Sequence, residues 1–500
     1  MSARRRAPLI LPLTVAGLAV VVVAVAARAR RGDGSRAGHA VGRHTRFGRN
    51  VEVAKLGASV GRVYASTSAR KVFASVERRI ELDRERELRT AEAVAERLGQ
   101  MKGALMKLGQ MASYLDEGLA EPVRAALGQL RSQAPPMSAE LAAGVIEAEL
   151  GAPPEQLFLE WDPTPIAAAS IGQVHRALIV DPKTGDELAV AVKVQYPGVK
   201  EAVSADLANA DLLGAILKQG FGSLDPSEMV DEIRERLTEE LDYTIEAGNQ
   251  RTFAEYYRGH PYFHVPEVID HLSTSRVLTT ELATGRSFEE VLTWDQHERD
   301  LAAETIFRFV FRSLYRFHAF NGDPHPGNYL FEPGGKVTFL DFGLVKHFTT
   351  DELDVFQRMI SAAVIQPDPA RFRAVIEEAG LLQRDAPVDT DEAGRYFSRF
   401  YDAVRDDGDM VWTPEYASSI VRHTFDRTSP IAQYATVPRS FVFIQRINLG
   451  LYAILGQLRA AGNYRRIASE LWPMVDAPPS TPMGVAEAEW LARRFATPTR

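Results

Sequence analysis

The chain of 500 residues contains no cysteine. This absence excludes disulfide bonds, thiolate zinc sites and cysteine nucleophiles, and it fits a reducing compartment. An excess of positive charge is missing too, because 66 acidic residues outnumber 58 basic ones and give a formal net charge of -8. Proteins that bind nucleic acid usually have a basic balance, so we expect no nucleic-acid partner. With 45% hydrophobic and 25% charged residues, the composition is that of a folded protein with room for more than one domain.

One uncharged run stands out near the N-terminus. Residues 7–27 read APLILPLTVAGLAVVVVAVAA, which is long enough to cross the hydrocarbon core of a bilayer as a helix. The arginines around this run are slightly more numerous on its C-terminal side, which favours an outer N-terminus and a cytoplasmic body. We therefore expect a single-pass anchor. A cleavable signal peptide remains the alternative, because Ala24-Val25-Ala26 has small residues at cleavage spacing.

The most informative residues lie in the second half of the chain. Asp323 and Asn328 stand five residues apart, and Asp341-Phe342-Gly343 follows after one predicted hairpin. In kinases, an aspartate at the first place holds or deprotonates the attacking hydroxyl, while the asparagine and the second aspartate hold magnesium ions. We assign these roles to Asp323, Asn328 and Asp341. Their order predicts a site that binds ATP with Mg²⁺ and transfers or hydrolyses the terminal phosphate.

A lysine suited to such a site lies upstream. Two predicted strands, 174–180 and 187–194, are joined by the turn 181–186, and the second strand carries Lys193. A lysine at this place binds the α- and β-phosphates of ATP. It also needs a carboxylate, because a buried and unpaired charge is costly. We expect an acidic residue of the following helix to supply that carboxylate, and the candidates are Glu239, Glu240, Asp242 and Glu246.

Glu246 belongs to a helix that we predict over residues 229–250. Asp242 lies four residues before Glu246, so the two side chains should share a face of this helix. Further along, residues 276–282 form a short β-rich run before Gly285, at the place of the hinge between the two lobes of a kinase. We expect the backbone at this hinge, including Glu281, to contact adenine.

Two features of ordinary protein kinases are missing. The first is a glycine-rich phosphate loop, in whose place alanines restrict positive φ and crowd the backbone. The residues of this predicted nucleotide-binding turn are Ala167, Ala168, Ala169, Ser170, Ile171 and Gly172. The second is a long activation segment, because a helix cap at Thr349 follows Gly343 with only five residues between them. The usual platform for a peptide substrate should therefore be absent.

A predicted helix over residues 98–119 contains unexplained glycines. Gly99, Gly103 and Gly109 each cost about 1 kcal/mol relative to alanine in a helix interior. Close packing of this helix against another backbone would give the glycines a purpose, and it would fix the positions of Lys107 and Gln110.

The motifs together resemble the UbiB/AarF family of atypical, protein kinase-like kinases, which is tied to isoprenoid quinone biosynthesis. Lys107-Leu108-Gly109-Gln110 is similar to the family's K-x-G-Q motif, residues 167–173 to its alanine-rich loop, and Glu240-Leu241-Asp242 to its E-x-D motif. The residues that fall on its kinase positions are Lys193, Glu246, Asp323, Asn328 and Asp341.

The resemblance implies a two-lobed α+β fold of the protein kinase type, with an N-terminal helical extension and extra C-terminal helices. In this family the K-x-G-Q segment packs over the nucleotide site, so Lys107, Gly109 and Gln110 would regulate access from a place against Glu240 and Asp242. The resemblance also implies ATPase or small-molecule kinase activity with ATP and Mg²⁺, at a membrane. The expected partners are a membrane lipid or quinone precursor and proteins of quinone biosynthesis.

We accordingly expect six parts. These are a transmembrane anchor (7–27), a flexible basic linker (28–50), a helical extension with the K-x-G-Q motif (51–160), a kinase-like N-lobe (161–283), a C-lobe with added helices (284–472) and a polar, proline-rich tail (473–500). A protein kinase and a nucleotide-sensing scaffold without turnover remain alternative functions.

Overall fold

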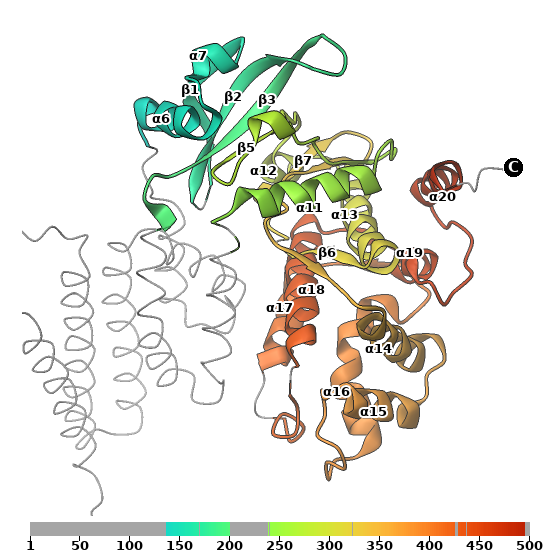
Figure 1. The fold of residues 1–500 in the computed structure, drawn as a ribbon. Coiled ribbons are helices and arrows are strands. Elements are labelled where there is room, and N and C mark those ends of the chain that lie inside the picture. Colours follow the sequence, from blue (N-terminus) through green and yellow to red (C-terminus); the bar gives the residue numbers. More distant parts are fainter. Residues whose placement is uncertain are drawn as a thin grey trace, which may run out of the picture. The chain divides into compact units, whose positions relative to one another are not determined.

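The computed structural model describes residues 137–495, apart from residues 201–238 and the positions 170, 240, 323, 426–428 and 437. The predicted anchor, the basic linker and most of the helical extension therefore lie outside the described residues. Within the part of the chain that is described, no helix is both long and apolar enough to span a membrane. Figure 1 shows the described elements in colour along the chain.

The N-lobe is built on a four-stranded antiparallel sheet in the order β1-β2-β3-β5 (Figure 1). The strands are β1 (Glu160–Ala168), β2 (Gly172–Val180), β3 (Glu187–Gln195) and β5 (Val277–Glu281). The hairpin of β2 and β3 follows the sequence prediction, whereas β1 was not foreseen because Pro163 and Pro165 interrupt it. Proline cannot donate to a sheet ladder, but it is tolerated in an edge strand such as β1.

From residue 137, where the description begins, two helices precede this sheet, α6 (Ala139–Leu150) and α7 (Pro154–Leu157). Helix α6 starts at Ser138, whose hydroxyl accepts a backbone N–H of the first turn, and it ends at Gly151 with a left-handed φ of 81°. Val145 and Ile146 of α6 belong to one apolar cluster with the valines of β3, which alternate along the strand. One face of the sheet is thereby covered.

Helix α11 (Tyr243–Tyr256) follows the segment 201–238 and carries Glu246. The prediction of a continuous helix through Asp242 is wrong, because Asp242 has an extended backbone and is the N-cap of α11. Its carboxylate accepts the backbone N–H of Thr244 at 2.9 Å. An aspartate at this place stabilises a helix start by satisfying a free N–H group of the first turn.

The second lobe combines short strands with helices. A three-stranded sheet has the order β4-β8-β7, and β6 pairs with β9. The hairpin of β7 and β8 crosses residues 333–335 as the sequence predicts. The elements of this part are β4 (Phe263–His264), α12 (Phe288–Val291), α13 (Gln296–Phe317), β6 (Ala319–Asn321), η3 (Pro326–Asn328), β7 (Tyr329–Glu332), β8 (Lys336–Phe339) and β9 (Val345–His347). The turn η2 (Asp270–Leu272) belongs to the N-lobe instead, because Leu272 packs in the apolar cluster of α6 and β3.

The chain continues mostly as helices after β9. Helix α14 starts at a capping box in which Thr349 and Glu352 bond each other's backbone N–H, as expected for a helix start at Thr349. The elements are α14 (Thr350–Ile360), the π-helical turn η4 (Ser361–Ile365), α15 (Pro369–Glu378), α16 (Thr390–Ser398), η5 (Arg399–Val404), β10 (Met410–Val411), α17 (Pro414–Phe425), α18 (Arg439–Leu458), β11 (Ala461–Gly462), α19 (Tyr464–Leu471) and α20 (Pro482–Arg494).

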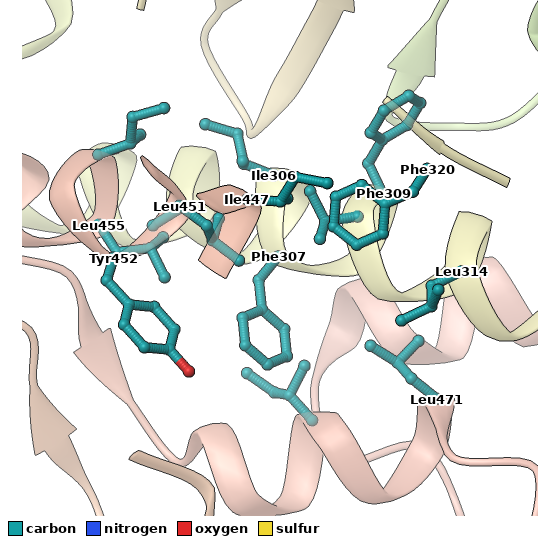
Figure 2. Packing of buried hydrophobic residues seen from close by; sticks show 14 of the residues in the cluster. Ile306, Phe307, Phe309, Leu314, Phe320, Ile447, Leu451, Tyr452, Leu455 and Leu471 are labelled. Atoms are coloured by element: carbon teal, nitrogen blue, oxygen red, sulfur yellow. The ribbon is translucent and has the colours of Figure 1, made fainter. Parts of the chain in front are cut away.

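The largest apolar core forms around α13. Figure 2 shows Ile306 and Phe307 of α13 beside Leu451 and Leu455 of α18. The ring of Phe309 stacks on Phe339 of β8, with 3.6 Å between the ring centroids. Helix α13 thus joins the strands that follow it to the C-terminal helices.

The expected polar tail at residues 473–500 contains a packed helix instead. Helix α20 buries Met483, Glu487 and Trp490, which are spaced four and three residues apart and so lie on one helix face. Thr481 caps the helix, and Pro482 occupies its first turn, where a missing N–H costs little. The sequence did not indicate this helix, because the segment is polar on average and only one face of the helix is buried.

Candidate functional site

A charged pair joins the N-lobe sheet to α11. The ammonium nitrogen of Lys193, on β3, lies 2.7 Å from each carboxylate oxygen of Glu246. Glu246 is buried, Lys193 is partly buried, and the ammonium group also lies 5.0 Å from the ring centroid of Tyr243. The partner that the sequence predicts for Lys193 is therefore in place, one turn into α11.

The environment keeps Lys193 charged. Burial by itself lowers the pKa of this lysine, but the carboxylates of Glu246 and Asp341 outweigh it and raise the pKa above the usual value. Because the pKa of Lys193 is higher in the folded than in the unfolded protein, its charge contributes its full stabilisation at any pH below the unfolded pKa of about 10.4. This contribution is lost only as the pH rises through the folded pKa. The pair therefore persists throughout the physiological pH range.

The Asp341-Phe342-Gly343 segment lies against the same helix. Phe342 is fully buried, with its ring centroid 4.9 Å from that of Phe253 on α11. The side-chain amide of Asn249 donates to the carbonyl of Phe342 at 3.0 Å. A Cβ atom on Gly343 would lie 3.2 Å from Oδ1 of Asp341 and 3.7 Å from Oε2 of Glu246, so glycine permits a close approach. Lys193, Glu246 and Asp341 are thus brought together.

Asn328 is placed beside Asp341 by backbone pairing. It ends the short helix η3, and its carbonyl accepts the N–H of Leu340, the residue before Asp341, at 3.0 Å. Asp341 is held further by Asn321, whose side-chain amide donates to its carbonyl at 2.6 Å. Asp323 lies outside the described residues, so its predicted role stays a prediction.

The alanine-rich segment forms the turn between β1 and β2. Ala167 and Ala168 end β1, and the N–H of Ala169 donates to the carbonyl of Gly172 at 2.9 Å. A Cβ atom on Gly172 would lie 2.7 Å from the hydroxyl of Tyr243 and would collide with the carbonyl of Val194, so only glycine fits there. This turn has the place of a phosphate loop, although its contact with a nucleotide stays a prediction.

These residues fit a magnesium nucleotide by their chemistry. Mg²⁺ prefers oxygen ligands and is commonly held by one or two protein groups together with phosphate oxygens. Asn328 and Asp341 would provide an amide and a carboxylate oxygen, and Lys193 a fixed positive charge for the phosphates. The metal would neutralise charge on the phosphate groups.

Comparisons with known proteins agree with this arrangement. A model of the ABC1 atypical kinase-like domain matches residues 129–375. The solved structure of Rv3197 from Mycobacterium tuberculosis in complex with erythromycin shares 31% identity, covers 75% of this chain and 94% of its own, and gives a TM-score of 0.57. The chain belongs to the ABC1 family of atypical kinases. This confirms the resemblance to the UbiB/AarF family and a kinase-like α+β fold.

Two curated relatives match about half of this chain. The mitochondrial atypical kinase COQ8B of Rattus norvegicus is 34% identical over 278 residues, which are 55% of this chain and 51% of the relative. An aarF domain-containing protein kinase of Arabidopsis thaliana, described as uncharacterized and chloroplastic, is 37% identical over 245 residues, 49% of this chain and 32% of the relative. The chain thus spans about half the length of these relatives, or less.

The short segment after Asp341-Phe342-Gly343 is ordered in this ABC1-family chain. Residues 345–347 form β9, which pairs with β6 from Ala319↔His347 to Asn321↔Val345. The cap of α14 follows at Thr349. As the sequence predicts, no long activation segment intervenes, since residues 344–349 are all described.

The predicted hinge follows strand β5, and two of its N–H groups bond within the protein. Residues 277–281 do form a strand, but the N–H of Glu281 donates to Glu267 and that of Leu282 to Ala189, each at 2.9 Å. The Glu281 carboxylate lies 3.5 Å from His264, whose hydrogen bond lowers the pKa of Glu281. These two N–H groups are therefore bonded within the protein, and the predicted contact of the hinge backbone with adenine stays a prediction.

The predicted regulatory residues are only partly described. Lys107, Gly109, Gln110 and Glu240 lie outside the described residues, and so does Ser170 of the alanine turn. Asp242 is described, and its carboxylate caps α11. The predicted contact between the K-x-G-Q and E-x-D motifs therefore stays a prediction.

Three residues at the site were not predicted from the sequence, namely Asn249, Asn321 and Gly450. Asn249 and Asn321 hold the segment around Asp341, and only the position of Asn249, three residues after Glu246 on α11, was a usable signal. Gly450 lies inside α18, where a glycine is costly and so needs a reason. The reason is Pro324, next to Asp323, because a Cβ atom on Gly450 would collide with the proline ring.

Gly450→Ala should therefore disturb the segment around Pro324. We expect faster hydrogen exchange in peptides that cover residues 319–329, because the proline or α18 must move. The control is Gly394→Ala in α16, where a Cβ atom meets nothing within 4 Å. Equal exchange of residues 319–329 in the two variants would contradict this role of Gly450.

Proposed function

We propose that this chain is an atypical kinase or ATPase that binds ATP with Mg²⁺. The observation that carries the proposal is the Lys193–Glu246 pair with both oxygen contacts at 2.7 Å, beside an Asp341 carboxylate that helps to raise the lysine pKa. Such a lysine, held by a helix glutamate, is one of the two arrangements that a protein kinase needs in place for phosphoryl transfer. The other is the aspartate of Asp-Phe-Gly on the metal.

Each residue takes one role in the proposed reaction. Lys193 holds the α- and β-phosphates, and Glu246 orients it. Asn328 and Asp341 hold Mg²⁺. Asp323 orients the nucleophile, which is water or a hydroxyl group, and accepts its proton.

The nucleotide part of the proposal is tested by removing the ammonium group. Lys193→Ala should weaken MgATP binding by about 10- to 100-fold, since a hydrogen bond to a charged group is worth about 1.5–3 kcal/mol. Isothermal titration calorimetry measures this affinity. The matched control is Lys183→Ala, which removes the exposed lysine that pairs with Glu267 in the β2–β3 turn. Unchanged affinity in Lys193→Ala, or equal losses in both variants, would contradict the assignment.

The phosphate acceptor is a small molecule, a lipid precursor or water rather than a peptide. The support is the short ordered connection through β9, which leaves no long activation segment between Gly343 and Thr349. The family resemblance adds a role in the biosynthesis of isoprenoid quinones or related prenyl lipids, with proteins of that pathway as partners. Residues 7–27 would anchor the protein, with the kinase-like body on the cytoplasmic side. The relatives named COQ8B and aarF domain-containing kinase are described as mitochondrial and chloroplastic.

Quinone profiling of a strain that lacks this gene tests the pathway. We expect a lower quinone content that is restored by the wild type and by Lys183→Ala, but not by Lys193→Ala. A chain without residues 2–27 should move from the membrane to the soluble fraction and restore quinones less well.

The outcomes separate the parts of this proposal. Unchanged quinones in the deletion strain would refute the pathway, and full rescue by Lys193→Ala would refute the enzymatic role. A mature wild-type protein that has lost residues 1–26, detected by mass spectrometry, would refute the retained anchor in favour of a signal peptide.

A further inference from the structure

Helix α11 carries Glu246 near its start and meets another helix at its end. Glu246 lies in the first turn of α11, and the helix ends at Tyr256. From Glu246 to Tyr257 the distance along the axis is about 17 Å at the usual rise of 1.5 Å per residue. A helix of this length moves largely as one body, so whatever holds its end influences where Glu246 lies.

The end of α11 is held by α20. The indole nitrogen of Trp490 donates to the carbonyl of Arg258 at 3.2 Å. The Trp490 ring lies 6.2 Å from the ring of Tyr257, nearly parallel to it, and 4.6 Å from the ring of His260. Arg494 donates to the carbonyl of Glu255 at 3.0 Å and also pairs with its carboxylate. Trp490 and Arg494 thus donate hydrogen bonds to backbone carbonyls on both sides of Tyr256, the last residue of α11.

Buried charges fix α20 itself to α13. The carboxylate of Glu487 lies 3.0 Å from the Arg308 guanidinium and 2.9 Å from that of Arg312. Arg308 is fully buried and is also bound by Glu304 at 2.7 Å and by Glu470 of α19 at 2.8 Å. Because a buried charge left without its partner is costly, this cluster strongly favours one position of α20 on α13.

The middle of α11 contacts both α13 and the Asp341-Phe342-Gly343 segment. The Phe253 ring lies 5.9 Å from Phe309 of α13 and 4.9 Å from Phe342. Four residues before Phe253, and so closer to Glu246, the side-chain amide of Asn249 donates to the carbonyl of Phe342. A tilt of α11 would therefore move Glu246 away from Lys193 and disturb the residue next to Asp341.

We propose that α20 is a positioning element of the nucleotide site, in which Trp490 and Arg494 hold α11 so that Glu246 faces Lys193. This inference rests on the proposed function, since it assigns α20 to the same MgATP site. Neither residue touches the predicted nucleotide site, so both act through α11.

The test uses variants of the full chain. Arg494→Ala removes a partly exposed side chain, Trp490→Phe keeps a ring but loses the N–H donor, and Trp490→Ala loses both. The control is Trp472→Ala, because Trp472 is as buried as Trp490 and packs against Arg465. Two quantities are measured: hydrogen exchange in peptides of residues 243–256, and the KM and kcat for MgATP.

We expect Arg494→Ala and Trp490→Ala to speed exchange in α11 and to lower kcat/KM for MgATP by about tenfold or more, since small misplacements of a catalytic group can cost up to about 100-fold. Trp490→Phe should show a smaller change in the same direction. Trp472→Ala should lower the melting temperature without either effect. If Trp490→Ala does not fold, Arg494→Ala and Trp490→Phe decide the question.

A double-mutant cycle shows whether the effect passes through Glu246. In a Glu246→Gln background, Arg494→Ala should lower kcat/KM much less than in the wild type, because the positioned group is already impaired. Additive losses, or unchanged exchange in α11, would overturn the inference. A wild type that does not bind MgATP would refute the proposed function, and the exchange measurement would still decide whether α20 holds α11.

Discussion

The arrangement of the site depends on one requirement, that the charge of Lys193 on an apolar strand be paired. Removing one partner of a buried ion pair typically costs about 3–5 kcal/mol, so the Lys193–Glu246 contact fixes where α11 can lie against the sheet. Once α11 is fixed, Asn249 and Phe253 fix the segment that contains Asp341. The β7–β8 hairpin then places Asn328 beside Asp341. The positions of the candidate site residues thus depend on a series of contacts that begins with the Lys193–Glu246 ion pair.

Around this pair, glycine is used for close approach rather than for flexible loops. Gly172 lies against the backbone of β3, Gly343 against the carboxylates of Asp341 and Glu246, and Gly450 against Pro324. The turn between β1 and β2 has alanines instead, and a short strand stands where an activation segment would lie. Both features restrict the backbone, and they support the proposal of a small acceptor rather than a peptide.

Much of the site could be predicted because its residues are tied to motifs at fixed spacing. Lys193, Glu246 and Asp341 lie on the strand, helix and hairpin end that the sequence indicates, and the structure brings them together. The edge strand β1 was missed because its pairing depends on a strand that comes later in the chain. The cap at Asp242 is a local contact with Thr244, which the helical spacing of the acidic residues concealed. Helix α20 was missed because its buried face carries only three large side chains, Met483, Glu487 and Trp490, in an otherwise polar segment.

The most direct measurement is the Mg²⁺ dependence of ATP binding to the wild type and to Asp341→Asn, followed by calorimetry. We expect saturable ATP binding by the wild type that requires Mg²⁺, and a large loss of that dependence in Asp341→Asn. A conservative change at the exposed Asp351 at the start of α14, Asp351→Asn, should leave the binding intact. If the wild type did not bind ATP with Mg²⁺, or bound it equally well in the presence of EDTA, the proposed magnesium nucleotide site would be refuted.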